Sequence, residues 1–294
     1  MEKKYPQLTL KKAVSFSGIG VHSGRETFVT INPAPENHGI RFKRTDLPGT
    51  SDIQVLFKTV VDTSLATVIG ENGVIVSTIE HLMAAFTGLG IDNALVEISG
   101  HEMPIMDGSA ETFTSLILDQ GLQAQDRSKC FFIVTRPVSV NEGKKSVTIY
   151  PDSGFKITCS IDFDHPLIGY QEFTFDFFHD NFLTEISPAR TFGFVKDLEY
   201  LKKFGLGRGG SLENAIVIDR DRIVNKEGLR FSDEFVRHKL LDCLGDFSLL
   251  GMPIQGHIKT HRSGHALNHA FIKKFLMEKQ SWTTGPVEME RSTP

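Results

Sequence analysis

The segment RHKLLDCLGD, residues 237–246, carries a polar row on an otherwise apolar helix. His238, Asp242 and Asp246 are four residues apart, so at about 100° per residue they fall within about 80° of one another. The apolar residues around them are Phe235, Leu240, Leu244, Phe247 and Leu249. A helix that is apolar on nearly all sides is normally buried. The pattern therefore predicts one histidine and two carboxylates inside the protein.

The spacing of His238 and Asp242 suits a metal site, because side chains one helical turn apart point the same way. A catalytic zinc site needs three protein ligands and an open position for water. Spacing alone favours a simple hydrogen-bonded pair. Burial changes this balance, because an unpaired buried carboxylate is costly. Two carboxylates on an apolar helix indicate a cation or strong hydrogen-bond donors nearby.

A third ligand must come from elsewhere, and STIEHLMAA, residues 77–85, contains Glu80 and His81. Two interpretations stay open. Ser77 to Glu80 matches a capping box, which would make Glu80 only a helix-capping residue, and His81 would then be a core histidine. Alternatively, His81 is a ligand and Glu80 a reactive carboxylate beside it. The spacing does not choose between them.

The segment HRSGHALNH, residues 261–269, has three histidines at four-residue intervals. A second metal site there is disfavoured, because Gly264 marks a turn that leaves His261 outside the helix opened by His265. His265 and His269 could still share a face, with His269 equally able to be exposed. A histidine beside Asp246 makes better chemical sense, because the carboxylate would raise its pKa and keep it an imidazolium.

The composition of the 294-residue chain restricts its class: 40% of residues are hydrophobic and the formal net charge is −4. The chain lacks the excess of basic residues that would indicate a nucleic-acid-binding surface. No run of apolar residues approaches the roughly 20 that a membrane span needs. The start, MEKKYPQLTLKK, lacks the apolar core of a signal peptide. The three scattered cysteines form no C-x-x-C pair, which indicates a reducing compartment. We expect a soluble cytoplasmic protein.

Periodicity predicts strands and helices in both halves of the chain. In the first half we expect strands at 26–34 and 92–100 and helices at 77–90 and 107–121. Ser77 would cap the first helix, and Asp107 or Ser109 the second. In the second half we expect strands at 130–140, 145–151, 155–163, 171–177, 214–219 and 254–260. The helices expected there lie at about 194–204, 232–250 and 263–279.

Both halves end with a helix, a strand, a glycine turn and a helix, and the turns DGSAE (107–111) and SGHAL (263–267) are similar. We interpret this as an internal duplication, which would make the helices of His81 and His238 equivalent elements of two packed domains. The polar stretch at 121–129 predicts the boundary. We expect a first domain at 1–125, a second at 126–280 and a C-terminal tail at 281–294.

Several longer motifs occur in order between SGIGVHSG and about residue 278: STIEHLMAAFTGLGIDNALVEI, EMPIMDGSAETF, ARTFGF, GLRFSDEFVRHKLLDCLGD and SGHALNH. In these motifs the sequence resembles the UDP-3-O-acyl-N-acetylglucosamine deacetylases, which catalyse the committed step of lipid A biosynthesis in Gram-negative bacteria. The resemblance implies an α+β fold with two similar domains. Each would be a small, mostly antiparallel sheet packed on two helices, with the helices sandwiched between the two sheets.

The resemblance also implies one catalytic zinc ion between the domains, at a site that accepts Fe²⁺ as well. The ligands carried over are His81, His238 and Asp242. Glu80 matches the family's general base, and His265, supported by Asp246, matches a catalytic histidine that stays protonated. Thr191 in ARTFGF matches a hydroxyl that stabilises the oxyanion.

The implied reaction hydrolyses the N-acetyl group of UDP-3-O-(3-hydroxyacyl)-N-acetylglucosamine to acetate and a free amine. Zinc would acidify water and polarise the amide carbonyl, and Glu80 would accept the proton of the attacking water. Thr191 and His265 would help the metal to stabilise the oxyanion. The leaving amine needs a proton, and both His265 and protonated Glu80 stay open as its source.

The resemblance implies further contacts to the substrate. Lys239 would contact the UDP diphosphate, and Phe192 and Phe194 the sugar and nucleotide. The alternatives are an exposed helix lysine and two core phenylalanines. The segment at about 194–217 matches an insert that forms a hydrophobic passage for the acyl chain. The residues expected to line or shape it are Leu198, Leu201, Gly207, Gly210, Leu212 and Val217. His22 in GVHSG is expected near the site, with a structural role equally open.

Two other function classes compete with this one. Small sheet-plus-helix domains also occur in ribosomal proteins, but the net charge and the buried His and Asp row argue against RNA binding. The second competing class is a hydrolase that has the same metal site but acts on another substrate. We expect a UDP-linked acylated sugar as partner, no nucleic acid, no membrane span, transient contact with the inner membrane, and a monomer. We also expect no fused dehydratase after the deacetylase.

Overall fold

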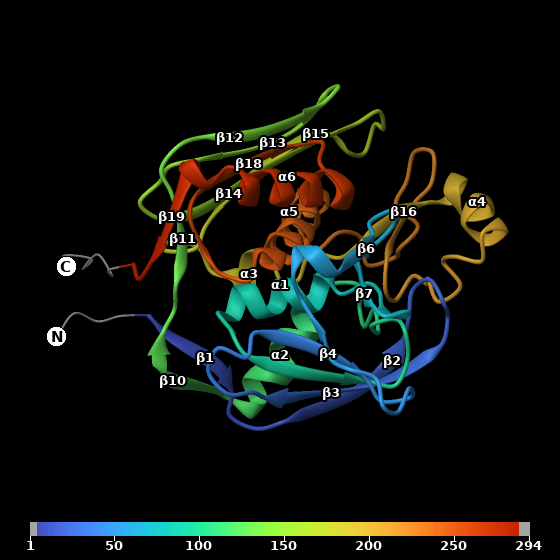
Figure 1. Cartoon of the computed structure of the whole chain (residues 1–294). Helices are drawn as coiled ribbons and strands as arrows, with labels where there is room; N and C mark the ends of the chain where they lie inside the picture. Colours follow the sequence, from blue (N-terminus) through green and yellow to red (C-terminus); the bar gives the residue numbers. More distant parts are fainter. Residues whose placement is uncertain (1–4, 288–294) are drawn as a thin grey trace.

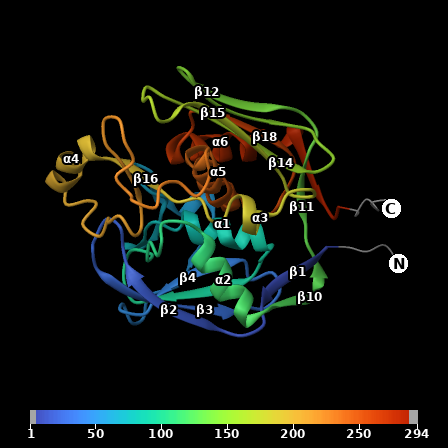
Figure 2. The ribbon, with the colours of Figure 1, turned by 180° about the vertical axis from the view of Figure 1, so that it is seen from behind.

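Two sheets enclose a layer of helices in the computed structural model, which describes residues 5–287 (Figure 1). α1 (Glu80–Leu89) and α2 (Glu111–Gln120) lie against the first sheet, and α5 (Glu234–Phe247) and α6 (His265–Met277) against the second. Figure 2 shows the same layers from behind, with α1 and α5 in the middle. The predicted α+β fold with helices between two sheets is confirmed.

The first sheet has the strand order β2-β3-β9-β4-β5. Its strands are β2 (Val14–Ile19), β3 (Glu26–Pro33), β4 (Ile40–Arg44), β5 (Ile53–Gln54) and β9 (Ala94–Ile98). All neighbours are antiparallel except β4 and β9. Buried and more exposed residues alternate along β3 and β9, so one face of the sheet packs on the helices.

The second sheet contains the order β12-β13-β18-β14-β15. These strands are β12 (Val138–Glu142), β13 (Lys145–Tyr150), β14 (Phe155–Phe163), β15 (Gly169–Asp176) and β18 (Ile254–His261). Its parallel pair, β14 and β18, holds the same positions in the order as β4 and β9. The two sheets therefore share one topology, as the duplication predicts. The boundaries given for the two domains stay predictions.

Two strands extend the second sheet beyond this common order: β11 (Phe131–Val134) pairs with β18, and β19 (Trp282–Gly285) pairs with β11. The predicted tail at 281–294 was therefore wrong over its first residues. The Trp282 ring packs edge-on against Phe132, and its Nε1 donates to the Phe275 carbonyl at 2.8 Å. Residues 288–294 of that tail lie outside the described residues.

The stretch at 121–129, predicted as a boundary, contains β10 (Leu122–Ser128), which pairs with β1 (Pro6–Leu10). Pairing satisfies the backbone groups of this polar segment. The remaining small sheets are β6 (Val60–Asp62), β7 (Val68–Glu71) and β8 (Val74–Val76), and the pair β16 (Phe192–Phe194) and β17 (Ile216–Ile218). Short helices are α3 (Phe182–Glu185) and α4 (Leu198–Lys203).

The helix expected at about 194–204 begins later than predicted. Phe194 ends β16, a 3₁₀ turn occupies Val195–Asp197, and α4 starts at Leu198. Parallel pairing with β17 holds Phe192–Phe194 extended, which overrides the local helical pattern. β16 and α4 project to one side of the layers (right in Figure 1).

The burial predicted for α5 is confirmed: His238, Asp242 and Asp246 are only 2–5% exposed. α5 crosses α1 at Gly245, where an added Cβ would clash with the backbone carbonyl of Glu80. Glycine inside a helix costs about 1 kcal/mol relative to alanine, and here it permits the close crossing. The crossing brings the first turn of α1 against the polar row of α5.

Candidate metal centre and active site

The start of α1 is set by the chain that precedes it. Ser77 donates from its backbone N–H and its Oγ to the His101 carbonyl, and Thr78 has a φ of +58°. α1 begins at Glu80, with Ile79 at its N-cap and no side-chain cap. The predicted Ser77 cap and the capping-box interpretation of Glu80 are therefore wrong. The Glu80 carboxylate instead accepts the Thr67 N–H at 3.1 Å.

His81, His238 and Asp242 meet between α1 and α5. Each offers one ligand atom, and these atoms lie within 4.8 Å of one another. Asp242 Oδ1 is 3.4 Å from His238 Nε2 and 3.6 Å from His81 Nε2. Ligands at about 2.0–2.2 Å from a tetrahedral zinc ion lie about 3.3–3.6 Å from one another. The spacing observed between these atoms is that of a metal site.

The protonation of His238 gives an independent test of this fit. Its Nδ1 donates to the Ala189 carbonyl at 3.0 Å, which leaves Nε2 without a proton in the neutral ring. Burial lowers the pKa of His238 to about 3 in spite of Asp242. The Nε2 lone pair thus faces a carboxylate oxygen, an arrangement that a cation between them would stabilise. The donor set fits a divalent metal ion.

Lys239 contacts Asp242, donating from Nζ to Oδ2 at 2.7 Å. Its side chain is 24% exposed, so the exposed-lysine alternative does not hold. Burial alone would raise the pKa of Asp242, but Lys239 and His238 hold it well below its usual value. Asp242 is therefore a carboxylate at neutral pH. The contact of Lys239 with a diphosphate stays a prediction.

His265 opens α6, as predicted, and its Nδ1 donates to Asp246 Oδ2 at 2.9 Å. Burial would lower the pKa of His265, but the Asp246 carboxylate outweighs it and raises the pKa to about 10. Its other nitrogen, Nε2, lies 3.8 Å from Glu80 Oε1. Burial raises the pKa of Glu80, although His265 opposes this. A carboxylate and an imidazolium thus lie together next to the metal cluster.

Thr191 begins the segment that leads into β16, and Gly108 fixes it by accepting its N–H at 2.8 Å. The preceding residue, Arg190, was not predicted to have a role, although it belongs to the motif ARTFGF. Arg190 is 4% exposed and donates to Glu234, which is fully buried, from its backbone N–H and its Nε. This ion pair anchors the segment on α5 and so positions the Ala189 carbonyl that orients His238.

Phe192 and Phe194 are half-buried and take part in aromatic packing. The Phe192 ring lies 5.0 Å from that of Phe235 and 6.3 Å from that of His238. Phe194 packs against Phe163 and lies under the Lys196 ammonium. Both rings therefore have a packing role, and Phe192 also lies next to the ligand His238. The contact of both rings with substrate stays a prediction.

The predicted passage residues lie on the projecting segment around α4 and β17. Leu198 is 39% and Leu212 44% exposed, Leu201 and Val217 are half-buried, and Gly210 is exposed. Leu201 is the side chain nearest to Gly207. The backbones of 208 and 209 donate to the carbonyls of His22 and Val21, which ties the segment to the β2–β3 turn. The role of these residues in acyl binding stays a prediction.

His22 and His261 are not members of the metal-ligand cluster, and the expected position of His22 near the site stays a prediction. His22 donates its backbone N–H to buried Glu102 at 2.7 Å, and burial lowers the pKa of its ring. His261 ends β18 and contacts Ser160 Oγ at 2.9 Å. Within residues 5–287, His81, His238 and Asp242 form the one cluster with metal-ligand spacing.

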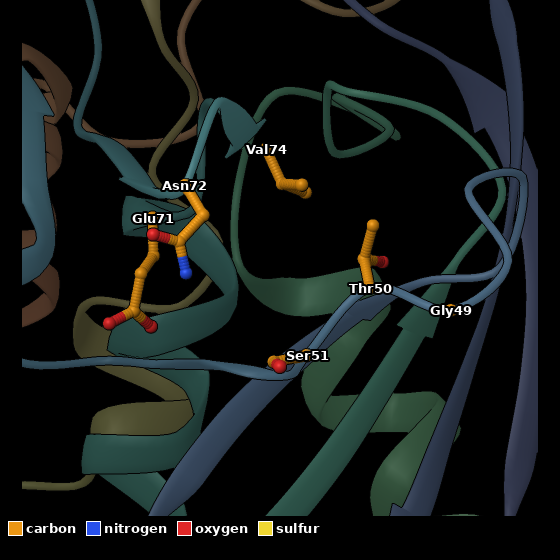
Figure 3. A pocket seen from close by; sticks show the side chains of 6 residues that line it. All are labelled: Gly49, Thr50, Ser51, Glu71, Asn72 and Val74. Atoms are coloured by element: carbon orange, nitrogen blue, oxygen red, sulfur yellow. The ribbon is translucent and has the colours of Figure 1, made fainter.

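A separate pocket lies between the β4–β5 connection and the β7–β8 turn (Figure 3). The residues that line it are Gly49, Thr50, Ser51, Glu71, Asn72 and Val74. None of them belongs to the metal cluster or to the Glu80–His265 pair. The pocket is therefore distinct from the candidate active site.

A family model for the UDP-3-O-acyl N-acetylglycosamine deacetylases matches residues 7–277. The chain belongs to this family. A relative from Myxococcus xanthus (strain DK1622), named UDP-3-O-acyl-N-acetylglucosamine deacetylase, is 51% identical over 282 residues, which cover 96% of this chain and 90% of the relative. Proteins of the same name from Syntrophus aciditrophicus (strain SB) and Teredinibacter turnerae (strain ATCC 39867 / T7901) are 46% and 44% identical over 280 and 290 residues. Those alignments cover 95% and 98% of this chain, and 89% and 96% of the relatives.

Membership in this deacetylase family confirms the resemblance stated from the motifs and makes the chain an enzyme of the hydrolase class. In the part of the chain that the structure describes, no helix has the length and hydropathy needed to cross a membrane.

Proposed function

We propose that the chain hydrolyses the N-acetyl group of UDP-3-O-(3-hydroxyacyl)-N-acetylglucosamine, which yields acetate and a free amine and is the committed step of lipid A biosynthesis. One observation carries the proposal. In a chain of this family, a buried cluster of two histidines and an aspartate lies beside a carboxylate paired with a protonated histidine. RNA binding needs no such cluster, and the net charge of −4 opposes it.

The cation proposed for the cluster is Zn²⁺, with Fe²⁺ as the alternative that the same donors accept. When bound, it supplies Lewis acidity, which polarises an amide carbonyl and makes water acidic enough to lose a proton near neutral pH. The chain prepares the ligands: Ala189 fixes the tautomer of His238, and Lys239 keeps Asp242 ionised. His81 completes the set from the other helix.

Glu80 is the proposed general base. Burial raises the pKa of Glu80, and general-base catalysis is most efficient when the pKa of the base lies near the pH at which the enzyme works. His265, held by Asp246, contributes positive charge to the oxyanion, and the Thr191 hydroxyl contributes a hydrogen bond. The leaving nitrogen takes its proton from His265 or from Glu80 once protonated, since the two groups lie 3.8 Å apart.

Substrate contacts complete the proposal. Lys239 binds the diphosphate, Phe192 and Phe194 the sugar and nucleotide, and the segment at 194–217 the acyl chain. Exposed apolar side chains on that segment support an acyl site and brief contact with the inner membrane face. The free cysteines support a cytoplasmic location, and we propose a monomer.

The test is acetate release by the purified protein from the acylated UDP-sugar, with UDP-N-acetylglucosamine as the control that lacks only the acyl chain. Acetate and free amine are expected in equal amounts from the acylated substrate. The control should react at least about 10-fold more slowly in kcat/KM, because it forgoes the binding energy of the acyl chain. Absence of acetate from both substrates would refute the activity, and equal rates would refute the acyl site.

The pH profile should depend on Asp246. The proposed mechanism uses the imidazolium of His265, which is present below its pKa of about 10 and lost above it. In Asp246→Asn burial dominates and the pKa falls, so the alkaline limb of kcat/KM should move at least about one unit to lower pH. Asp92→Asn removes a carboxylate paired with Lys129 outside the site and should leave the profile unchanged. An unmoved alkaline limb in Asp246→Asn would contradict the assignment.

A further inference from the structure

Thr67 lies between the reactive groups of the two halves of the chain. It precedes β7 and is 2% exposed. Its backbone N–H donates to Glu80 Oε2 at 3.1 Å, and its carbonyl accepts the Ile79 N–H at 3.4 Å. The backbone of Thr67 is therefore tied to the start of α1, where the proposed base stands.

The side chain of Thr67 reaches across to α5 and α6. Its hydroxyl donates to Asp246 Oδ1 at 2.5 Å, and its Oγ1 lies 3.3 Å from His265 Nδ1. Asp246 accepts two further hydrogen bonds, from His265 Nδ1 and from Asn268 Nδ2 at 2.7 Å. Three donors thus hold this buried carboxylate, and the one from Thr67 comes from the opposite half of the chain.

We propose that Thr67 is a positioning residue that sets the placement of His265 relative to Glu80, an inference that rests on the function proposed above. Through its backbone N–H, Thr67 holds Glu80, the proposed base. Through its hydroxyl it holds Asp246, the carboxylate that supports His265. The two groups that it links are 3.8 Å apart at Glu80 Oε1 and His265 Nε2. In catalysis, a misplacement of about 1 Å can cost about 100-fold in rate.

A packing role for Thr67 predicts a different response to mutation from a positioning role. Valine has the shape of threonine without the hydroxyl, whereas serine keeps the hydroxyl and loses the methyl group. If Thr67 only fills space, Thr67→Val is harmless and Thr67→Ser is the damaging change. If its hydrogen bond to Asp246 matters, Thr67→Val is the damaging change and Thr67→Ser is harmless. Both variants keep the backbone N–H that Glu80 accepts.

The experiment compares kcat and KM for Thr67→Val and Thr67→Ser in the metal-loaded protein. Thr67→Val should lower kcat at least about 10-fold, with KM and metal content within about twofold of the parent. Thr67→Ser should retain kcat within about threefold. Thr114→Val is the matched control, because the hydroxyl of this buried threonine donates to the Glu111 carbonyl within its own helix. Parental kcat in Thr67→Val, or an equal loss in both variants, would overturn the proposal.

A second measurement is independent of turnover. The His265 Nδ1–H proton, assigned by its absence in His265→Gln, should shift in NMR spectra of Thr67→Val without substrate and stay in place in Thr114→Val. An unchanged chemical shift of this proton in Thr67→Val would overturn the proposal even if activity fell. Absence of acetate release by the parent protein would refute the proposed function while this shift still reported the geometry. If Thr67→Val does not fold, Thr67→Ala replaces it with the same expectations.

Discussion

Replacing Glu80 with glutamine is expected to lower kcat by about 100-fold or more while the protein keeps a full equivalent of metal. General acid–base catalysis typically contributes about 10²- to 10⁴-fold to a rate. Glutamine has the shape of glutamate and an oxygen that can still accept the Thr67 N–H. It cannot accept a proton from water at neutral pH. The substitution therefore removes the proposed base and leaves its surroundings in place.

The matched control for this prediction is Glu97→Gln, the same chemical change at a half-buried carboxylate on β9 that accepts from Asn32. Its kcat should stay within about twofold of the parent. Stopped assays of acetate release, together with elemental analysis, measure both quantities. Near-parental turnover in Glu80→Gln would remove Glu80 from the mechanism and leave His265 as the group to test.

Replacing His81 with alanine should weaken metal binding at least about 100-fold and abolish measurable turnover without added metal. Loss even of the partners that orient metal ligands costs about 10- to 100-fold in affinity or activity, and here a ligand itself is removed. The two donors that remain, His238 and Asp242, both come from α5. The expected result is a protein that elutes from gel filtration without its equivalent of metal.

His261→Ala is the control for that experiment, because it removes a half-buried histidine that contacts Ser160 rather than the cluster. It should retain one equivalent of metal and parental activity. Chelation of the parent protein should abolish acetate release, and added Zn²⁺ should restore it. A full equivalent of metal in His81→Ala would refute the proposed ligand set.

The polar row on α5 could be predicted from sequence because helical periodicity is a local property. His238, Asp242 and Asp246 share a face wherever that helix packs, and the apolar surroundings indicated burial. The relation of this row to His81 is not local, so the residues alone left two interpretations of Glu80. The capping box failed for a tertiary reason: Ser77 is already bonded to His101, and Thr78 turns the chain before the helix begins.

Other features left no local signal. Thr67 is one threonine in the run LATVIG, and its contacts arise only because the turn before β7 meets α5 and α6. β19 falls within the segment predicted as tail, yet β11 pairs with it. Arg190 could have been suspected, since an arginine next to Thr191 in an apolar segment needs a buried partner. That partner, Glu234, lies far along the chain.

The geometry of the active site is sensitive to substitution of Gly245, a residue that has no side chain to take part in catalysis. Even a methyl group there would act as a wedge at the crossing of α1 and α5 and push Glu80 away from its counterparts. His81 would be carried off with it, so the third donor would be lost without any ligand being altered. One close helix crossing thus decides whether the two similar halves of the chain work as one enzyme.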